Sequence, residues 1–212
     1  MKRMIGAVLV AFTTLATVSS CTKDPMNNLS EEESRIYITN RDSSASFSSY
    51  KTYSISDSVT VVDNNSFAGQ QATPADQQAL AAVRSQLESR GYVRVSRDHS
   101  PDLGVNVSRL YNTTTSVVDM YDYWGSYGGY YDPFYWGYGG YGYGYPSTYG
   151  LVQSTEAMLS VDLLDLKNAP ANRTIRVIWN GLIRGTGVFN SDALTTGIQA
   201  LFAQSPYLKT VQ

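Results

Sequence analysis

The sequence predicts a two-layer α+β domain, with a mainly antiparallel sheet and two amphipathic helices on one face. Two observations predict this class. Several segments alternate apolar and polar residues and are joined by short turns, which favours neighbouring antiparallel strands. Two other segments place their apolar residues at helical spacing on one stripe, and each stripe needs a sheet face to bury it.

The first segment of the chain predicts export. Lys2 and Arg3 precede an apolar run over residues 4–18, and small residues follow it. This is the pattern of a secretory signal peptide over residues 1–20, because the apolar run is too short for a typical membrane-spanning helix.

The only cysteine, Cys21, directly follows this leader and resembles the lipobox cysteine of bacterial lipoproteins. By that resemblance it becomes the mature N-terminus and carries acyl chains such as palmitate. Two or more chains anchor a protein stably, so we expect Cys21 to hold the protein at the outer membrane. Two placements of the domain stay open: it could face the periplasm or the cell surface. The alternative is an ordinary leader followed by a free thiol.

Composition bounds the rest of the chain. A hydrophobic content of 42% and 212 residues suit one globular domain after removal of the leader. The net charge is -2, and loss of the two basic leader residues leaves 14 basic against 18 acidic residues, or -4. Because no basic cluster is present, we expect no nucleic-acid partner.

Residues 21–45 are rich in Ser, Asn, Asp and Glu, which predicts a flexible tether between the anchor and the domain. A short strand is expected inside it, at residues 35–39. The domain itself is expected over residues 46–209, and it contains a Tyr/Gly-rich insert at residues 121–150.

A helix over residues 74–90 is the clearest expected element. Thr73 suits the N-cap, Pro74 suits the first helical position, and Asp76 stands three residues after the cap. Gly91 suits the left-handed cap at the other end. The buried stripe of this helix is expected to consist of Leu80, Val83 and Leu87.

The remaining elements follow in the order strands, insert, hairpin and helix. Trp179 lies in the second strand of the hairpin, and we expect its side chain in the core. The last helix begins at Asn190 or Ser191 and ends at Ser205. Its expected buried side is Leu194, Ile198, Leu201 and Phe202. The expected strands are residues 47–55, 59–62, 92–96, 103–108 with a continuation through 113–118, 157–164 and 175–180.

The insert is the one unusual stretch, with eleven of the 17 Tyr, nine of the 17 Gly and no Lys or Arg in residues 121–150. Ordering so many glycines costs backbone entropy, whereas Tyr makes contacts at little rotamer cost. Three interpretations stay open: a loosely packed surface loop, a contact surface for an envelope protein or for self-assembly, and a glycan-binding surface. The candidate ligand contacts are Trp124, Tyr131, Phe134, Tyr135 and Trp136.

Five short segments stand out in order along the chain: Tyr50–Tyr53, Arg90–Tyr92, Pro101–Leu103, Val161–Asp165 and Val177–Gly181. Together they resemble a known family, the bacterial lipoproteins grouped as domain of unknown function 4136 (DUF4136), of Bacteroidetes type. The resemblance spans about residues 46–209. Two departures are Gly104, where the family tends to carry an aliphatic residue, and Ser160 in the middle of a strand. The resemblance implies a fold and an envelope location but no activity.

Familiar catalytic sets are missing from the sequence. A nucleophile-base pair needs a histidine, and the single one, His99, lies in a turn where we expect it solvated. One His and one Cys cannot build a zinc or redox-metal site, so no metal or cofactor is expected. We therefore expect a non-enzymatic protein with a binding or scaffolding role.

An enzyme that uses carboxylates alone is the remaining catalytic alternative. Asp162 and Asp165 stand three residues apart on a strand, so they point to opposite faces, and both are expected at the solvent or at an edge. The segment 185–187 lacks the lysine of a phosphate loop and is expected to be a turn. Ser58, between Asp57 and Val59, resembles a bacterial O-glycosylation site.

Overall fold

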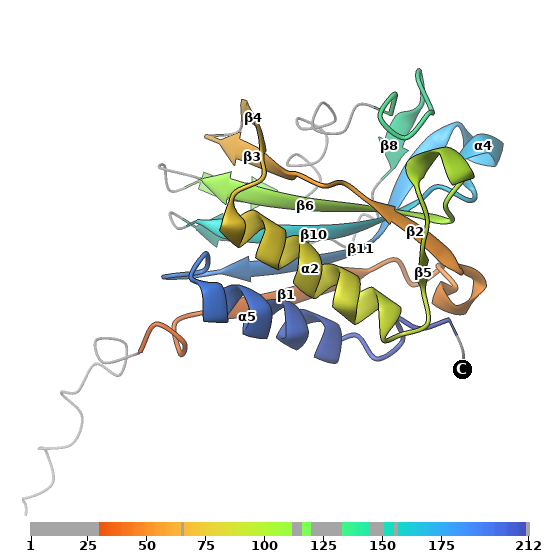
Figure 1. The fold of residues 1–212 in the computed structure, drawn as a ribbon. Coiled ribbons are helices and arrows are strands. Elements are labelled where there is room, and N and C mark those ends of the chain that lie inside the picture. Colours follow the sequence, from red (N-terminus) through yellow and green to blue (C-terminus); the bar gives the residue numbers. More distant parts are fainter. Residues whose placement is uncertain are drawn as a thin grey trace, which may run out of the picture.

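The structure is a computed structural model that describes residues 30–64, 66–111, 116–119, 133–144, 151–154 and 157–210. Its centre is a sheet in which the described residues form nine strands, in the order β1-β11-β10-β6-β2-β5 (Figure 1). In addition β3 lies beside β6, β4 beside β3, and β8 beside β11. The strands are β1 (Ile36–Arg41), β2 (Thr52–Ile55), β3 (Val59–Asp63), β4 (Ser66–Gln71), β5 (Val93–Arg94), β6 (Leu103–Tyr111), β8 (Gly142–Gly144), β10 (Met158–Asp165) and β11 (Thr174–Arg184).

The predicted fold class is confirmed. Strands β1, β11, β10 and β6 pair antiparallel, each with the next in this order, whereas β2 and β3 pair parallel with β6. Helices α2 (Pro74–Glu88) and α5 (Ser191–Ala203) lie side by side on one face of this sheet (Figure 1). Shorter helical segments are η2 (Phe47–Ser49), η3 (Arg97–His99) and α4 (Ala169–Asn172).

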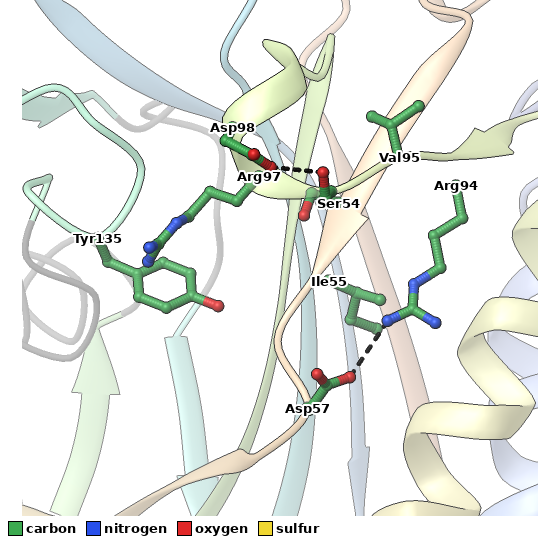
Figure 2. Close-up of a pocket in the computed structure, with 9 residues that line it drawn as sticks. Ser54, Ile55, Asp57, Arg94, Val95, Arg97, Asp98 and Tyr135 are labelled. Atoms are coloured by element: carbon green, nitrogen blue, oxygen red, sulfur yellow. Dashed lines mark hydrogen bonds and ion pairs between the residues drawn. The ribbon is translucent and has the colours of Figure 1, made fainter.

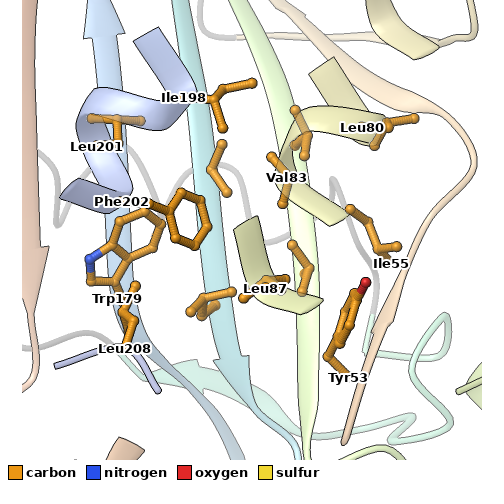
Figure 3. Close-up of a cluster of buried hydrophobic side chains, with 14 of the residues drawn as sticks. Tyr53, Ile55, Leu80, Val83, Leu87, Trp179, Ile198, Leu201, Phe202 and Leu208 are labelled. Atoms are coloured by element: carbon orange, nitrogen blue, oxygen red, sulfur yellow. The ribbon is translucent and has the colours of Figure 1, made fainter. Parts of the chain in front are cut away.

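The core beneath the two helices matches the predicted stripes. Leu80, Val83 and Leu87 of α2 are fully buried, as are Ile198, Leu201 and Phe202 of α5 (Figure 3). Trp179 of β11 packs on Phe202 with 5.2 Å between ring centroids, and its indole nitrogen donates to Ser205 Oγ at 3.0 Å. Burying each such side chain stabilises the fold by about 1.5–3 kcal/mol.

The N-terminus of α2 is built as expected. The Thr73 hydroxyl accepts from the Asp76 backbone N–H at 3.3 Å, and the Asp76 carboxylate accepts from the Thr73 N–H at 2.8 Å. Asp76 is fully buried and also forms an ion pair with Arg109 Nε of β6 at 2.6 Å. Gly91, with φ of +88°, follows the helix end and confirms the predicted left-handed cap.

The folded domain begins earlier than residue 46. The expected short strand exists as β1, and it pairs antiparallel with β11 along residues 36–41. Its backbone hydrogen bonds belong to the main sheet, so this part of the expected tether is structured. The expected strand at 113–118 is also different: β7 (Ser116–Asp119) pairs with β9 (Leu151–Ser154) in a separate two-stranded sheet, rather than continuing β6.

The second face of the sheet carries a row of polar side chains. Residues Asn40, Asn180, Asp162 and Asn106 stand opposite one another on β1, β11, β10 and β6. Asn180 and Asp162 are fully buried, and Asn106 is 4% exposed. The amide nitrogen of Asn180 donates to Asp162 Oδ1 at 2.6 Å and to Ser160 Oγ at 2.9 Å. The unusual Ser160 is therefore part of a buried polar cluster.

Candidate functional site

The described part of the aromatic insert, residues 133–144, packs on one end of this second face. Trp136 is 5% exposed and joins an apolar cluster with Leu164, Leu166 and Val177. The Tyr138 hydroxyl donates to the Leu166 carbonyl at 3.1 Å. Residues 142–144 add β8 to β11 as a parallel strand. These contacts make this part of the insert a packed layer rather than a loose loop.

Gly104 explains how Trp136 reaches the sheet. A Cβ atom at this position would lie 3.0 Å from Cζ2 of Trp136 and 3.2 Å from Leu166 Cδ1. An aliphatic residue, as the family pattern favours, would occupy the space of the indole ring. The Gly104 departure in the sequence was therefore a signal for this contact.

Trp136 in turn presents its neighbour Tyr135 at the rim of a groove. The two rings meet edge to face with 4.9 Å between centroids. The guanidinium carbon of Arg97 lies 4.6 Å from the centroid of the Tyr135 ring, in cation-π contact (Figure 2). Tyr135 and Arg97 thus form one wall of the groove.

The groove has a volume of about 770 Å³, in the range of small-molecule sites. Its floor is Ser54 and Ile55 of β2, and the opposite wall is formed by Asp57 and Arg94 (Figure 2). Asp57 Oδ1 accepts from Arg94 at 3.1 Å and from Arg84 at 2.9 Å, which holds both guanidinium groups in place. The groove therefore combines an aromatic face with hydroxyl, carboxylate and guanidinium groups.

Ser96, Asp98 and His99 belong to the short turn of η3 at the rim of the groove. The Ser96 hydroxyl lies 2.5 Å from Asp98 Oδ1 and 2.6 Å from His99 Nδ1, and the serine hydrogen bond lowers the pKa of the exposed Asp98. A catalytic triad needs the serine on one imidazole nitrogen and the acid on the other. Here Ser96 and Asp98 both contact Nδ1, and the His99 side chain is 72% exposed, so these three residues do not form a triad.

The expectation for Asp162 and Asp165 was half wrong. They do lie on opposite faces, but Asp162 is fully buried and Asp165 is 5% exposed. Burial raises the pKa of Asp162 well above its ordinary value. Asp165 accepts from the backbone and amide nitrogens of Asn168, so it begins a turn. Hydrogen bonds from polar neighbours, in the sheet for Asp162 and in the turn for Asp165, offset the cost of burying each carboxyl group. The alternation of residues along one strand does not reveal these neighbours.

Not every candidate site residue lies at the groove. Cys21, Trp124 and Tyr131 fall outside the described residues. Phe134 is 73% exposed and does not line the groove, and Trp136 is a buried anchor. Two further findings hold for the described part of the chain: it contains no group of three or more His, Cys, Asp or Glu that could hold a metal, and no helix that could span a membrane.

Ser58, the candidate O-glycosylation site, lies next to the groove. Its hydroxyl is within hydrogen-bonding distance of Ser56 Oγ at 3.2 Å and of Gln70 Oε1 at 3.1 Å. The side chain is half-buried. Modification of Ser58 would therefore require its donated hydrogen bond to Gln70 to break.

Comparisons with known proteins give the family. The model of DUF4136, a domain of unknown function, matches residues 38–207. The chain is also similar to the crystal structure of a DUF4136 family protein from Bacteroides thetaiotaomicron, with 24% identity and a TM-score of 0.70, over 84% of this chain and 99% of that one. No curated protein matches the chain.

Two weaker structural similarities have TM-scores below 0.5 and support no conclusion. One is a PDZ domain protein from Parabacteroides distasonis, with 13% identity and a TM-score of 0.46, over 83% of this chain and 37% of that one. The other is PelC from Paraburkholderia phytofirmans, with 12% identity and a TM-score of 0.40, over 84% of this chain and 99% of that one. Because the family model covers most of the sequence, the chain belongs to the DUF4136 family.

Proposed function

We propose that this protein is a lipid-anchored protein of the cell envelope with a non-catalytic binding or scaffolding role. The observation that carries the proposal is the position of Cys21, the only cysteine, directly after an apolar leader and small residues. Acyl chains on this residue would hold the domain at the outer membrane, and Thr22, which is not Asp, argues by analogy against retention in the inner membrane.

Membrane fractionation of the native host tests the anchor. Cys21→Ala should move the protein from the membrane fraction to the soluble fraction, and mass spectrometry of the wild-type protein should find acyl chains on Cys21. Thr22→Ala is the matched control, because it changes the neighbouring residue and leaves the thiol. Unchanged fractionation of Cys21→Ala, or a bare thiol in the mature protein, would refute the proposal.

A second candidate function is glycan binding, and the groove favours it. Sugar rings stack their apolar C–H faces on aromatic side chains, and Tyr135 supplies such a face at the groove wall. Sugar hydroxyls both donate and accept hydrogen bonds, which suits the carboxylate of Asp57 beside the guanidinium of Arg94. Because positive and negative groups line the groove together, an uncharged glycan fits it best.

A glycan array with the full-length protein in neutral detergent tests this second function. Tyr135→Ala should abolish binding, whereas Tyr135→Phe should retain it because the ring remains. Phe134→Ala serves as a matched control in the same loop, because Phe134 is exposed outside the groove. Equal binding by wild type and Tyr135→Ala would reject the groove as a glycan site.

A further inference from the structure

A second hollow, which shares no residue with the groove, has a different electrostatic character. Its volume is about 440 Å³, and it is lined by Arg41, residues 43–48, Tyr207 and Lys209. Two of these side chains are cationic and none is acidic. We propose that this hollow binds a phosphate group carried by a polar headgroup of sugar or glycerol size.

The two cations of the hollow are available to a ligand. Among the described residues neither Arg41 nor Lys209 takes part in an ion pair, and both are exposed. The guanidinium carbon of Arg41 lies 4.5 Å from the centroid of the Tyr207 ring, which orients the group without using its N–H donors. A guanidinium and an ammonium that face one hollow favour a phosphate, which accepts from both.

The neighbouring carboxylate does not compensate these charges. Asp42 is 5% exposed, forms an ion pair with Arg176, and accepts from the backbone and hydroxyl of Ser44. A third cation stands close by, because Lys51 Nζ donates to the carbonyl oxygens of Ser48 and Thr210 at 3.0 and 2.8 Å. Cations thus gather here in a chain whose net charge is negative, so composition alone does not explain the hollow.

The rest of the lining suits the remainder of such a ligand. Residues 43–48 include four serines. The Ser44 hydroxyl already donates to Asp42, and the hydroxyls of the other three, Ser43, Ser46 and Ser48, can donate to phosphate oxygens or accept from ligand hydroxyls. Phe47, which also lines the hollow, contacts Tyr207 with 5.3 Å between ring centroids. The hollow has the volume of a small-ligand site rather than that of a single ion. The ligand class is therefore a phosphorylated polyol, free in solution or as a lipid headgroup.

The test is an NMR titration of the full-length protein in neutral detergent micelles. The probe is glycerol 3-phosphate, and glycerate is the comparison, because it replaces the phosphate by a carboxylate. We expect saturable amide shifts confined to residues 43–48 and 207–210, with weaker binding of glycerate. Arg41→Gln and Lys209→Gln should each weaken binding about tenfold, the loss of one charge-assisted contact. Arg173→Gln is the matched control, because Arg173 also contacts a tyrosine ring, Tyr141, but lies outside the hollow.

A second arm separates the two sources of phosphate. Phosphatidylglycerol added to the micelles should displace glycerol 3-phosphate if the natural ligand is a lipid headgroup, and phosphatidylcholine should not. Binding of glycerol 3-phosphate without displacement assigns the hollow to a soluble ligand. The proposal is overturned if glycerate binds as tightly, if the shifts map elsewhere, or if Arg41→Gln binds like wild type.

Discussion

The two faces of the sheet bury their side chains in different ways. The face beneath α2 and α5 is mainly apolar, and its cluster includes the Trp179–Phe202 ring contact. The opposite face carries amides and one carboxylate in a row across four strands, and the aromatic insert, instead of a helix, packs on one end of it. Apolar packing has little directionality, whereas each polar group of the row needs a partner at a fixed position.

This difference indicates a division of roles. The apolar face supplies most of the stability, because its contacts remove large side chains from water. The polar row penalises wrong registers, because a slip by one residue would move Asp162 from its amide partner Asn180 into the apolar cluster of the other face. A substitution on the apolar face should therefore lower mainly the stability of the fold, whereas a substitution in the polar row should act through its hydrogen bonds and its charge.

The largest expected effect is on the helix-covered face. Asp76→Ala removes the reciprocal cap of α2 and leaves the Arg109 guanidinium unpaired in a buried position. We expect a loss of about 3–5 kcal/mol in the free energy of unfolding, measured by urea denaturation at neutral pH. Asp192→Ala is the matched control, because Asp192 also lies in the first turn of a helix but is exposed; it should cost less than about 1 kcal/mol. Similar losses for the two variants would contradict the role given to the ion pair.

The helix-covered face could be predicted because its signals are local. The cap residues Thr73 and Asp76, the apolar stripes and the alternation around Trp179 each lie within one segment of sequence. The partner of Asp76 was missed, because Arg109 lies 33 residues away and on another element. Local patterns specify an element and its buried side, but they do not specify which charged group meets it.

The second face could not be predicted because its contacts join distant segments. The groove combines β2, the turn after β5 and Tyr135 of the insert, and nothing local in these segments indicates that they meet. Asp162 was expected at the solvent or at an edge, and its burial was missed because its amide partner Asn180 stands on the next strand. Two residues in the sequence did indicate contacts on this face: Gly104, which departs from the family pattern, and Ser160, which is unusual in the middle of a strand. Both lie at buried contacts of this face.

An intermediate effect is expected where the insert meets the second face. Trp136→Ala removes a nearly buried indole and should cost about 3 kcal/mol. Hydrogen exchange should accelerate at residues 142–144, which pair with β11, and change little in α2.

Gly104→Val tests the same contact from the sheet. The added side chain should displace the Trp136 ring and lower the free energy of unfolding by about 1–3 kcal/mol.

The double variant sharpens this test. Removal of the indole makes room for the valine side chain, so Trp136→Ala combined with Gly104→Val should cost less than the sum of the two single variants. A double-mutant cycle measures this coupling directly. Additive losses would show that Gly104 and Trp136 do not share the contact, and equal acceleration of exchange in α2 would show that the two faces unfold as one unit.

The smallest effect, and the only expected gain, concerns the polar row. Burial raises the pKa of Asp162, so the folded state binds its proton more tightly than the unfolded state does. Stability contributed by the neutral acid is present below the unfolded pKa, near 3.8, and is lost as pH rises toward the folded pKa.

Asp162→Asn keeps an acceptor for Asn180 and brings an N–H donor opposite Asn106, whose Oδ1 has no hydrogen-bond partner among the described residues. Its melting temperature should therefore exceed that of wild type at pH 8, and the difference should shrink toward pH 4. Asp162→Ala, the comparison variant, should be less stable than Asp162→Asn by about 1–3 kcal/mol at every pH, because neither variant titrates at this position and only alanine leaves the Asn180 amide without this acceptor. A melting temperature of Asp162→Asn that follows the wild type across this pH range would mean that the carboxylate is not held in its neutral form by burial.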